Sequence, residues 1–190
     1  MPDIKPKRTT LSILVYNRSG VLMRVVGLFS RRGYNIDSLS VGVTEKEDVS
    51  RITVVVTGDQ GVIEQIKHQV GKLVEVIRVS EMRGSKSIQK ELVLIKVKAN
   101  EQTRGHVMEL ADIFKAKVED VTVSTITLQL TGGLDKIASF VNLTKGYGIV
   151  EMVRTGITAL GRGSESLSEQ SDEDFEDSYV SEPYGAEQQL

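Results

Sequence analysis

The sequence predicts an α+β protein: two ferredoxin-like βαββαβ domains in tandem, an N-terminal and a C-terminal one, followed by an acidic tail. Three observations support this. The 190 residues suffice for two small domains. Apolar residues alternate, or recur at helical spacing, in the order strand, helix, strand, strand, helix, strand. The same order returns about 85 residues later, after a polar stretch.

The first half is expected to contain four strands and two helices. Leu11, Ile13 and Val15 alternate in an apolar, β-branched run, which is typical of a strand. The first helix should end at Gly33, which follows two arginines, and Asp59 is a suitable N-cap for the second. The expected elements are residues 9–16, 21–32, 35–43, 51–57, 60–70 and 73–79.

The second half repeats this order with little sequence identity to the first. Thr103 can cap its first helix, and Gly132-Gly133 interrupts the chain before its second. The expected elements are residues 92–97, 104–114, 118–123, 126–130, 134–141 and 149–153. The predicted organisation is an N-terminal extension at 1–8, a first domain at 9–83, a linker at 84–90, a second domain at 91–163 and a tail at 164–190.

Right-handed crossovers place both helices of such a domain on one face of its sheet, which leaves the other face bare. Several apolar residues of the predicted strands fall outside the simple alternation, namely Leu14, Val55, Val74 and Val76. We therefore expect a sheet that is covered on both faces or buried in an oligomer.

The net charge of −2 conceals an uneven distribution. Residues 164–190 hold nine acidic residues and no Lys or Arg, which leaves 24 basic and 17 acidic residues in 1–163, a net charge of +7. The tail is too poor in apolar residues to fold alone, so we expect it to be disordered. The alternative is that it contacts a basic surface.

Composition excludes several kinds of chemistry. The chain has no cysteine, so thiolate metal sites, disulfides and cysteine nucleophiles are excluded. Its two histidines, His68 and His106, are expected on the surface, and no catalytic or metal-binding motif is present. Strands 51–56 and 126–130 lack the aromatic residues that stack RNA bases, so no nucleic-acid partner is expected. The apolar runs are too short to span a membrane, and a bacterial cytoplasm or plastid stroma is the expected location.

The turn Asn17-Arg18-Ser19-Gly20, which opens the first helix, is the most informative local feature. A helix N-terminus offers free N–H groups and partial positive charge to a carboxylate or phosphate. Gly20 would let a ligand approach the backbone, and Val21 and Leu22 follow as an apolar wall. A small aliphatic amino acid suits such a binding site better than a nucleotide does. The alternative is an ordinary turn in which Asn17 and Ser19 only cap the helix.

Two strings in the first half, NRSGVLMRV and GLFSRRGYNIDSL, resemble the small regulatory subunit of acetohydroxyacid synthase (acetolactate synthase), an ACT-domain family. Shorter strings in both halves are similar to this family too. The matching residues are 17–25, 27–39, 72–77, 91–97 and 153–156. The resemblance spans residues 9–163, and the tail has no counterpart in it.

The resemblance implies an ACT domain in the first half and no catalysis by this chain. A subunit of this family binds the large catalytic subunit, raises its activity and confers feedback inhibition by valine. The catalytic subunit would hold the cofactors thiamine diphosphate, magnesium and FAD, and this chain none. The pathway implied is branched-chain amino-acid biosynthesis.

The resemblance also implies a homodimer through ACT domains, with valine bound at the interface. Carried over to this sequence, one chain contributes the turn and the helix start, and its partner the beginning of the second strand. The expected effector residues are Asn17, Ser19, Gly20, Val21, Leu22, Asn35 and Ile36. Leucine or isoleucine would also fit, since a methylene changes binding by only about 1–3 kcal/mol. The alternative function is a free-standing amino-acid-binding ACT regulator of another enzyme or of transcription.

Overall fold

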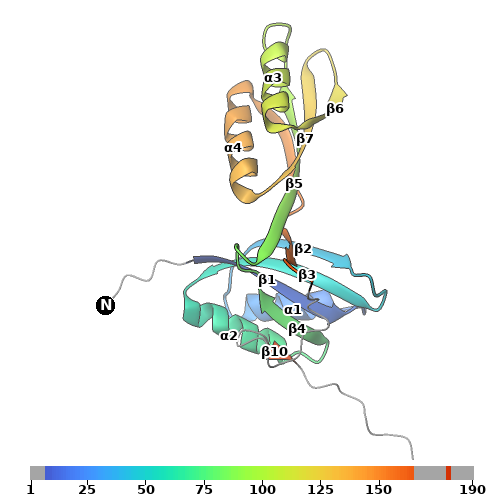
Figure 1. Ribbon diagram of the computed structural model, residues 1–190, viewed down its shortest axis with the longest axis vertical. Helices are drawn as coiled ribbons and strands as arrows, with labels where there is room; N and C mark the ends of the chain where they lie inside the picture. The colour runs from blue at the N-terminus through green and yellow to red at the C-terminus, as the bar shows by residue number, and fades with distance from the viewer. Residues whose placement is uncertain (1–6, 165–178, 181–190) are drawn as a thin grey trace, which may run out of the picture. The chain divides into compact units, whose positions relative to one another are not determined.

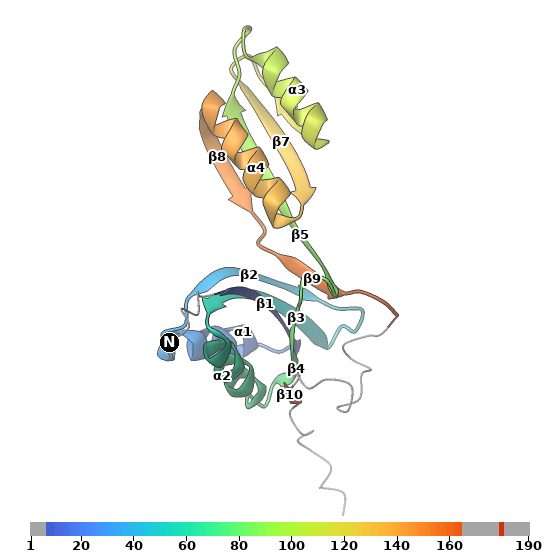
Figure 2. The same cartoon turned by 60° about the vertical axis from the view of Figure 1, so that its left-hand side comes forward.

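The computed structural model describes residues 7–164 and 179–180. These residues form two compact units (Figures 1 and 2). One unit joins the chain up to residue 88 with residues from 159 onward, and the other comprises residues 89–158. Each unit combines an antiparallel sheet with two helices, so the predicted α+β class is confirmed.

The first unit has the predicted βαββαβ order. Its elements are β1 (Lys7–Tyr16), α1 (Val21–Arg31), β2 (Ile36–Val43), β3 (Val49–Gly58), α2 (Gln60–Gly71) and β4 (Val76–Glu81). A further strand, β10 (Tyr179–Val180), extends the sheet, whose order is β10-β4-β1-β3-β2. Both helices cover one face of it (Figure 1).

The core of this unit lies between that face and the helices. Leu11, Ile13 and Val15 alternate inward from β1, as predicted, and pack with Phe29 of α1, which is only 1% exposed. The N-cap prediction for α2 is also confirmed, because the Asp59 carboxylate accepts a hydrogen bond from the Val62 N–H at 2.8 Å. Hydrophobic burial and capping therefore act together to fix α2 on the sheet.

The opposite face of the first sheet is covered within the chain. Leu14 and Val55 point away from the helices and are nevertheless 3% and 1% exposed, which confirms the expectation of a covered sheet for these two residues. Both views place β9 (Thr158–Gly161) on this side of the sheet (Figures 1 and 2). The half-buried Arg51 donates to Ser12 Oγ on this face, and burial lowers the pKa of its guanidinium while Glu45 opposes the shift.

The second unit repeats the order with an added 3₁₀ turn. Its elements are β5 (Ser87–Lys98), α3 (Arg104–Phe114), β6 (Lys117–Val121), β7 (Thr125–Gly132), α4 (Leu134–Thr144), η1 (Lys145–Tyr147) and β8 (Ile149–Arg154). The sheet order is β6-β7-β5-β8, and β9 pairs with β5 outside this path. Fully buried Ile95, Leu128 and Phe140 centre its core.

A charge pair between an exposed arginine and a buried glutamate ties a central strand of the second sheet to its edge strand. Arg154 of β8 donates from Nε and Nη2 to the two carboxylate oxygens of Glu91 in β5, at 2.8 and 2.6 Å. The Glu91 side chain is only 4% exposed, so this bidentate contact satisfies a carboxylate that water does not reach.

The unit boundaries differ from the predicted domain boundaries at two places. Strand β5 begins at Ser87, inside the expected linker at 84–90, and Ser87 is buried with its hydroxyl bonded to the Arg83 carbonyl at 2.7 Å. Residues 159–163, expected in the second domain, group with the first unit. Arg162 explains part of this grouping, because its backbone N–H donates to the Lys86 carbonyl and its Nε to the Ser87 carbonyl.

The cap expected of Thr103 is absent: its side chain makes no cap hydrogen bond to α3. Its hydroxyl instead accepts from the Asn100 N–H at 3.0 Å and contacts Asn100 Oδ1 at the same distance. Asn100 Oδ1 in turn accepts hydrogen bonds from the Gln102 and Thr103 N–H groups. The hydrogen bonds of these groups are therefore made within the loop that precedes α3.

Two residues of the tail depart from the expectation of disorder. Tyr179 and Val180 form β10 and pair antiparallel with β4, which corrects the expectation for these two residues. The remaining predictions for 165–178 and 181–190, and for the extension at 1–6, lie outside the described residues.

Candidate effector site

Gly20 sets the start of α1. Its φ of +86° lies in the left-handed region, where residues with a side chain are strained. It is the N-cap residue of α1 and provides no side chain to cap the helix. A Cβ added here would meet nothing within 4 Å, so the space above the turn is open. The sequence argument that Gly20 permits close approach therefore agrees with this geometry.

Two backbone amides in the first turn of α1 have no hydrogen-bond acceptor among the described residues. The Val21 N–H makes a long 3.4 Å bond to the Arg18 carbonyl, and the Arg24 N–H bonds to the Gly20 carbonyl at 3.1 Å. Between them, the N–H groups of Leu22 and Met23 have no acceptor among the described residues. The first turn also contains no acidic side chain. An anion placed here would gain two donors and the positive end of the helix dipole.

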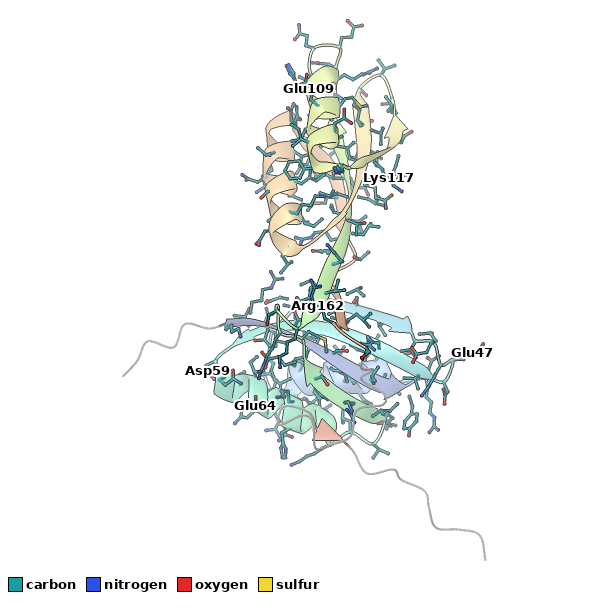
Figure 3. The ribbon with its side chains drawn as sticks, in the orientation of Figure 1. Glu47, Asp59, Glu64, Glu109, Lys117 and Arg162 are labelled. Carbon is teal, nitrogen blue, oxygen red and sulfur yellow. The ribbon has the colours of Figure 1, made fainter. Side chains whose placement is uncertain are left out.

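Asn17 fastens the turn to the neighbouring β2–β3 connection and does not cap α1. Its backbone N–H donates to the Asp48 carbonyl at 2.7 Å, and its side-chain Nδ2 donates to the Glu47 carbonyl at 2.9 Å (Figure 3 labels Glu47). Ser19 is exposed and gives no cap either. The capping role expected of Asn17 and Ser19 in the alternative is therefore wrong.

Charged side chains support the turn from both sides. The Arg18 guanidinium lies over the Tyr16 ring, with Cζ 5.1 Å from the ring centroid. Arg24, one turn into α1, pairs with Glu75, which precedes β4. These contacts hold the turn in place, and the Tyr16 N–H adds a 2.9 Å bond to the Glu75 carbonyl.

The apolar residues after Gly20 have different surroundings. Val21 is 4% exposed and belongs to the core of the first unit, while Leu22 is half-buried and packs against that core. Met23 is 74% exposed. Of the predicted apolar wall, Leu22 is thus the residue with surface left for a ligand, and the sequence argument did not single out Met23.

Asn35 and Ile36 begin β2, at the other end of α1. Asn35 Nδ2 donates to Asp37 Oδ1 at 2.9 Å, and Asp37 Oδ2 accepts from the Thr57 hydroxyl at 2.6 Å. Ile36 is half-buried against the core. Both asparagine side chains of the predicted site therefore use an N–H, which leaves the carbonyl oxygen of each amide as an acceptor for an ammonium group.

The structure does not bring the two halves of the predicted site together within one chain. Helix α1 has 11 residues and is about 16 Å long. Ile36 lies opposite Val56, whereas Tyr16, next to the turn, lies opposite Val49. The turn and the start of β2 therefore lie at opposite ends of the sheet.

The outer edge of β2 bears apolar side chains that the sequence argument missed. Val41 and Val43 are 51% and 60% exposed at the end of the sheet where β2 has no neighbouring strand among the described residues. Their alternation with Ser40 and Gly42 was the available signal, because apolar residues on an edge strand invite pairing with another chain.

Neither a metal site nor a membrane span is found in the described part of the chain. No group of three or more His, Asp or Glu residues there could hold a metal ion. No helix there is long and apolar enough to cross a membrane. His68 and His106 are exposed, as expected.

Both units match known protein families. Residues 11–78 match a family model described as the AHAS small subunit-like ACT domain, and residues 90–163 match the model for the small subunit of acetolactate synthase. The chain belongs to the acetolactate synthase small-subunit family. Its first unit is therefore an ACT domain, and α1 with its open N-terminus is part of that domain.

Individual relatives of this small-subunit family cover most of the chain. An acetolactate synthase small subunit of Mycolicibacterium smegmatis is 43% identical over 83% of this chain and 93% of its own length. A "probable acetolactate synthase small subunit" of Archaeoglobus fulgidus is 48% identical over 82% and 97%. The crystal structure of the acetolactate synthase small subunit from Thermotoga maritima superposes with a TM-score of 0.77 at 37% identity, covering 84% of this chain and 99% of that one.

Proposed function

We propose that this chain is the regulatory subunit of an acetolactate synthase, which activates the catalytic subunit and makes it sensitive to inhibition by valine. Family membership supports the regulatory role. The observation that carries valine binding is the pair of open amides of Leu22 and Met23, beside a glycine that leaves the space above them empty. Both family models are of the small subunit, so this proposal is favoured over a free-standing ACT regulator.

The valine carboxylate would sit on the start of α1. The amides of Leu22 and Met23 would donate to its oxygens, and the helix dipole would add to the attraction. The ammonium group would donate to the free carbonyl oxygens of Asn17 and Asn35. Leu22 and Ile36 would pack on the isopropyl group. The neutral amides suit a zwitterion, because they bind both charged ends without adding a net charge to the site.

A second copy of the chain would complete this site. If two β2 strands pair antiparallel across a two-fold axis, the beginning of the partner's β2 lies beside the end of β2 in this chain. Val43, at that end, lies opposite Ser50, which in turn lies opposite Val15, next to the turn. Such a dimer would bring Asn35 and Ile36 of one copy to the end of the sheet where Gly20 of the other copy lies. It would also bury Val41, Val43 and Met23.

Regulation would follow from a site that spans two chains. Valine can change activity only if it binds one arrangement of the dimer better than another. A ligand held by both copies favours the arrangement in which α1 of one copy and β2 of the other are closest. The catalytic subunit would sense that arrangement. It would hold thiamine diphosphate, magnesium and FAD, and the shared pathway would be branched-chain amino-acid synthesis in the cytoplasm or a plastid.

The test is reconstitution with the catalytic subunit of the same organism. Acetolactate formation should rise when the chain is added and fall again, saturably, as valine is titrated. Gly20→Asp places a second carboxylate where the valine carboxylate is proposed to bind. We expect like-charge repulsion to raise the valine concentration needed for half-maximal inhibition by about tenfold or more.

The matched control is Gly20→Asn, which has nearly the same size and tolerates the left-handed conformation equally well. It should retain most of the inhibition, since it lacks the charge. Equal loss in both variants would mean that backbone strain at Gly20, and not anion binding, explains the effect. Absence of both activation and valine inhibition with the unmodified chain would refute the proposed function.

A further inference from the structure

The first sheet has two outer edges, and a segment of the acidic tail covers one of them. Tyr179 and Val180 pair antiparallel with β4, Tyr179 opposite Val79 and Val180 opposite Arg78. Both views show β10 beside β4 (Figures 1 and 2). Without β10, β4 would be an edge strand with unpaired backbone groups, which is a template for pairing with another chain.

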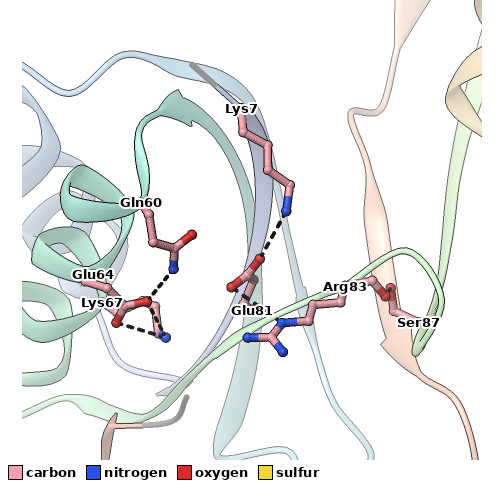
Figure 4. A network of polar contacts seen from close by, with 7 residues as sticks. All are labelled: Lys7, Gln60, Glu64, Lys67, Glu81, Arg83 and Ser87. Atoms are coloured by element: carbon pink, nitrogen blue, oxygen red, sulfur yellow. Dashed lines mark hydrogen bonds and ion pairs between the residues drawn. The ribbon is translucent and has the colours of Figure 1, made fainter. Parts of the chain in front are cut away.

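Basic side chains lie on the two elements next to this strand. Arg78 of β4 is 8% exposed, and Lys67 of α2 is fully buried, with Nζ 3.2 Å from the Glu64 carboxylate. Figure 4 shows Gln60, Glu64 and Lys67 as one polar cluster on α2, in which Gln60 Nε2 also donates to Glu64 at 2.9 Å. Lys72 follows α2 on the surface. Acidic side chains accompany them, since Glu64 lies on α2 and Glu81 on β4, so these two elements carry both signs of charge.

The strand is part of the same chain as the sheet that it extends. Residues 165–178, which precede it in the sequence, include seven acidic residues and no basic one. The covalent connection raises the local concentration of the strand at β4 above that of a separate chain.

We propose that the segment around Tyr179–Val180 is an intramolecular strand ligand of β4, and that it prevents this edge from pairing with a second copy of the chain. The assembly consequence rests on the proposed dimer through β2. A chain with two open edges could pair β2 with β2 and β4 with β4 in alternation, and such contacts build an open-ended array. Closing the β4 edge restricts the assembly to a closed dimer.

The test compares the full chain with a truncation that ends at Ser164. Backbone hydrogen exchange of β4 should become at least about tenfold faster in the truncated chain, while exchange of β3, inside the sheet, should not change. Val180→Pro in the full chain removes one strand N–H and should have the same effect on β4. The matched control, Ala186→Pro, lies beyond β10 in the sequence and should leave β4 protected.

Two further measurements address docking and assembly. A synthetic peptide of residues 165–190 should restore protection of β4 in the truncated chain. Sedimentation should detect species larger than a dimer for the truncated chain only. Strand docking would be overturned if β4 exchanged no faster after truncation, or if Ala186→Pro accelerated β4 exchange as much as Val180→Pro. The role in assembly would be overturned if the truncated chain remained dimeric. None of these readouts uses valine, so a failure of the proposed valine site would leave them unaffected.

Discussion

Asn17 illustrates which properties of a single residue can be predicted from the sequence. Its place in a turn before a helix was evident from the sequence, whereas the positive φ of Gly20 at the end of that turn is a finding of the structure. The group that accepts the hydrogen bond from the Asn17 side chain was not predictable. This acceptor is the Glu47 carbonyl, which comes within reach only when β3 pairs with β1. A cap at Asp59 was predictable, since its acceptor role depends on the N–H three residues later in the same helix.

Asp59 offers a direct test of that local contribution. Asp59→Ala removes the acceptor of the 2.8 Å bond from the Val62 N–H, and we expect the first unit to lose about 1 kcal/mol of unfolding free energy. Asp59→Asn keeps an acceptor oxygen and should lose only a few tenths of a kcal/mol. Urea unfolding followed by a probe in the first unit measures both. Equal losses would show that the carboxylate charge, and not the hydrogen bond, stabilises α2.

Helices and strands were predictable where apolar residues repeat with a clear period. The spacing in α1 and the alternation in β1 are examples, and both are present in the structure. Strand β5 was predicted too short, since four of the residues 87–91 carry polar side chains and its start is held by a hydrogen bond from Arg162, which is distant in the chain. Strand β10 has only two residues in an acidic tail, so it has no periodic signal at all.

The proposed dimer forms through the exposed edge of β2, so a substitution at this edge tests it. Val43→Lys places a charge on an exposed edge position, so folding of the chain should change by no more than about 0.5 kcal/mol. Pairing of two β2 strands should be lost, because each copy would have to desolvate a charged lysine at the interface. Light scattering should then report a monomer. Val123→Lys, at an 88% exposed position of the second unit, is the matched control and should remain a dimer. A dimeric Val43→Lys protein would exclude this edge.

For the molecule as a whole, the order of elements and the presence of two βαββαβ units followed from the sequence, since each is set by local periodicity and by right-handed crossovers. The residues at which the chain passes from one unit to the other were harder to predict from the sequence. Residues 159–163 return to the first unit through contacts with Lys86 and Ser87, which no local pattern encodes. The predicted site residues were likewise separated in space, because Gly20 and Asn35 lie at the two ends of α1. The proposed dimer would bring Gly20 of one copy and Asn35 of the other together.

A complementation experiment tests this shared valine site most directly. Gly20→Asp and Asn35→Lys chains are each expected to bind valine poorly alone, because each new charge repels one charged end of the amino acid. When the two are mixed and allowed to exchange subunits, a heterodimer contains one site with both substitutions and one site with neither. Calorimetric titration of the mixture should then recover about a quarter of the wild-type sites, with wild-type affinity. A mixture that binds no more valine than the separate variants would contradict a site built from two chains.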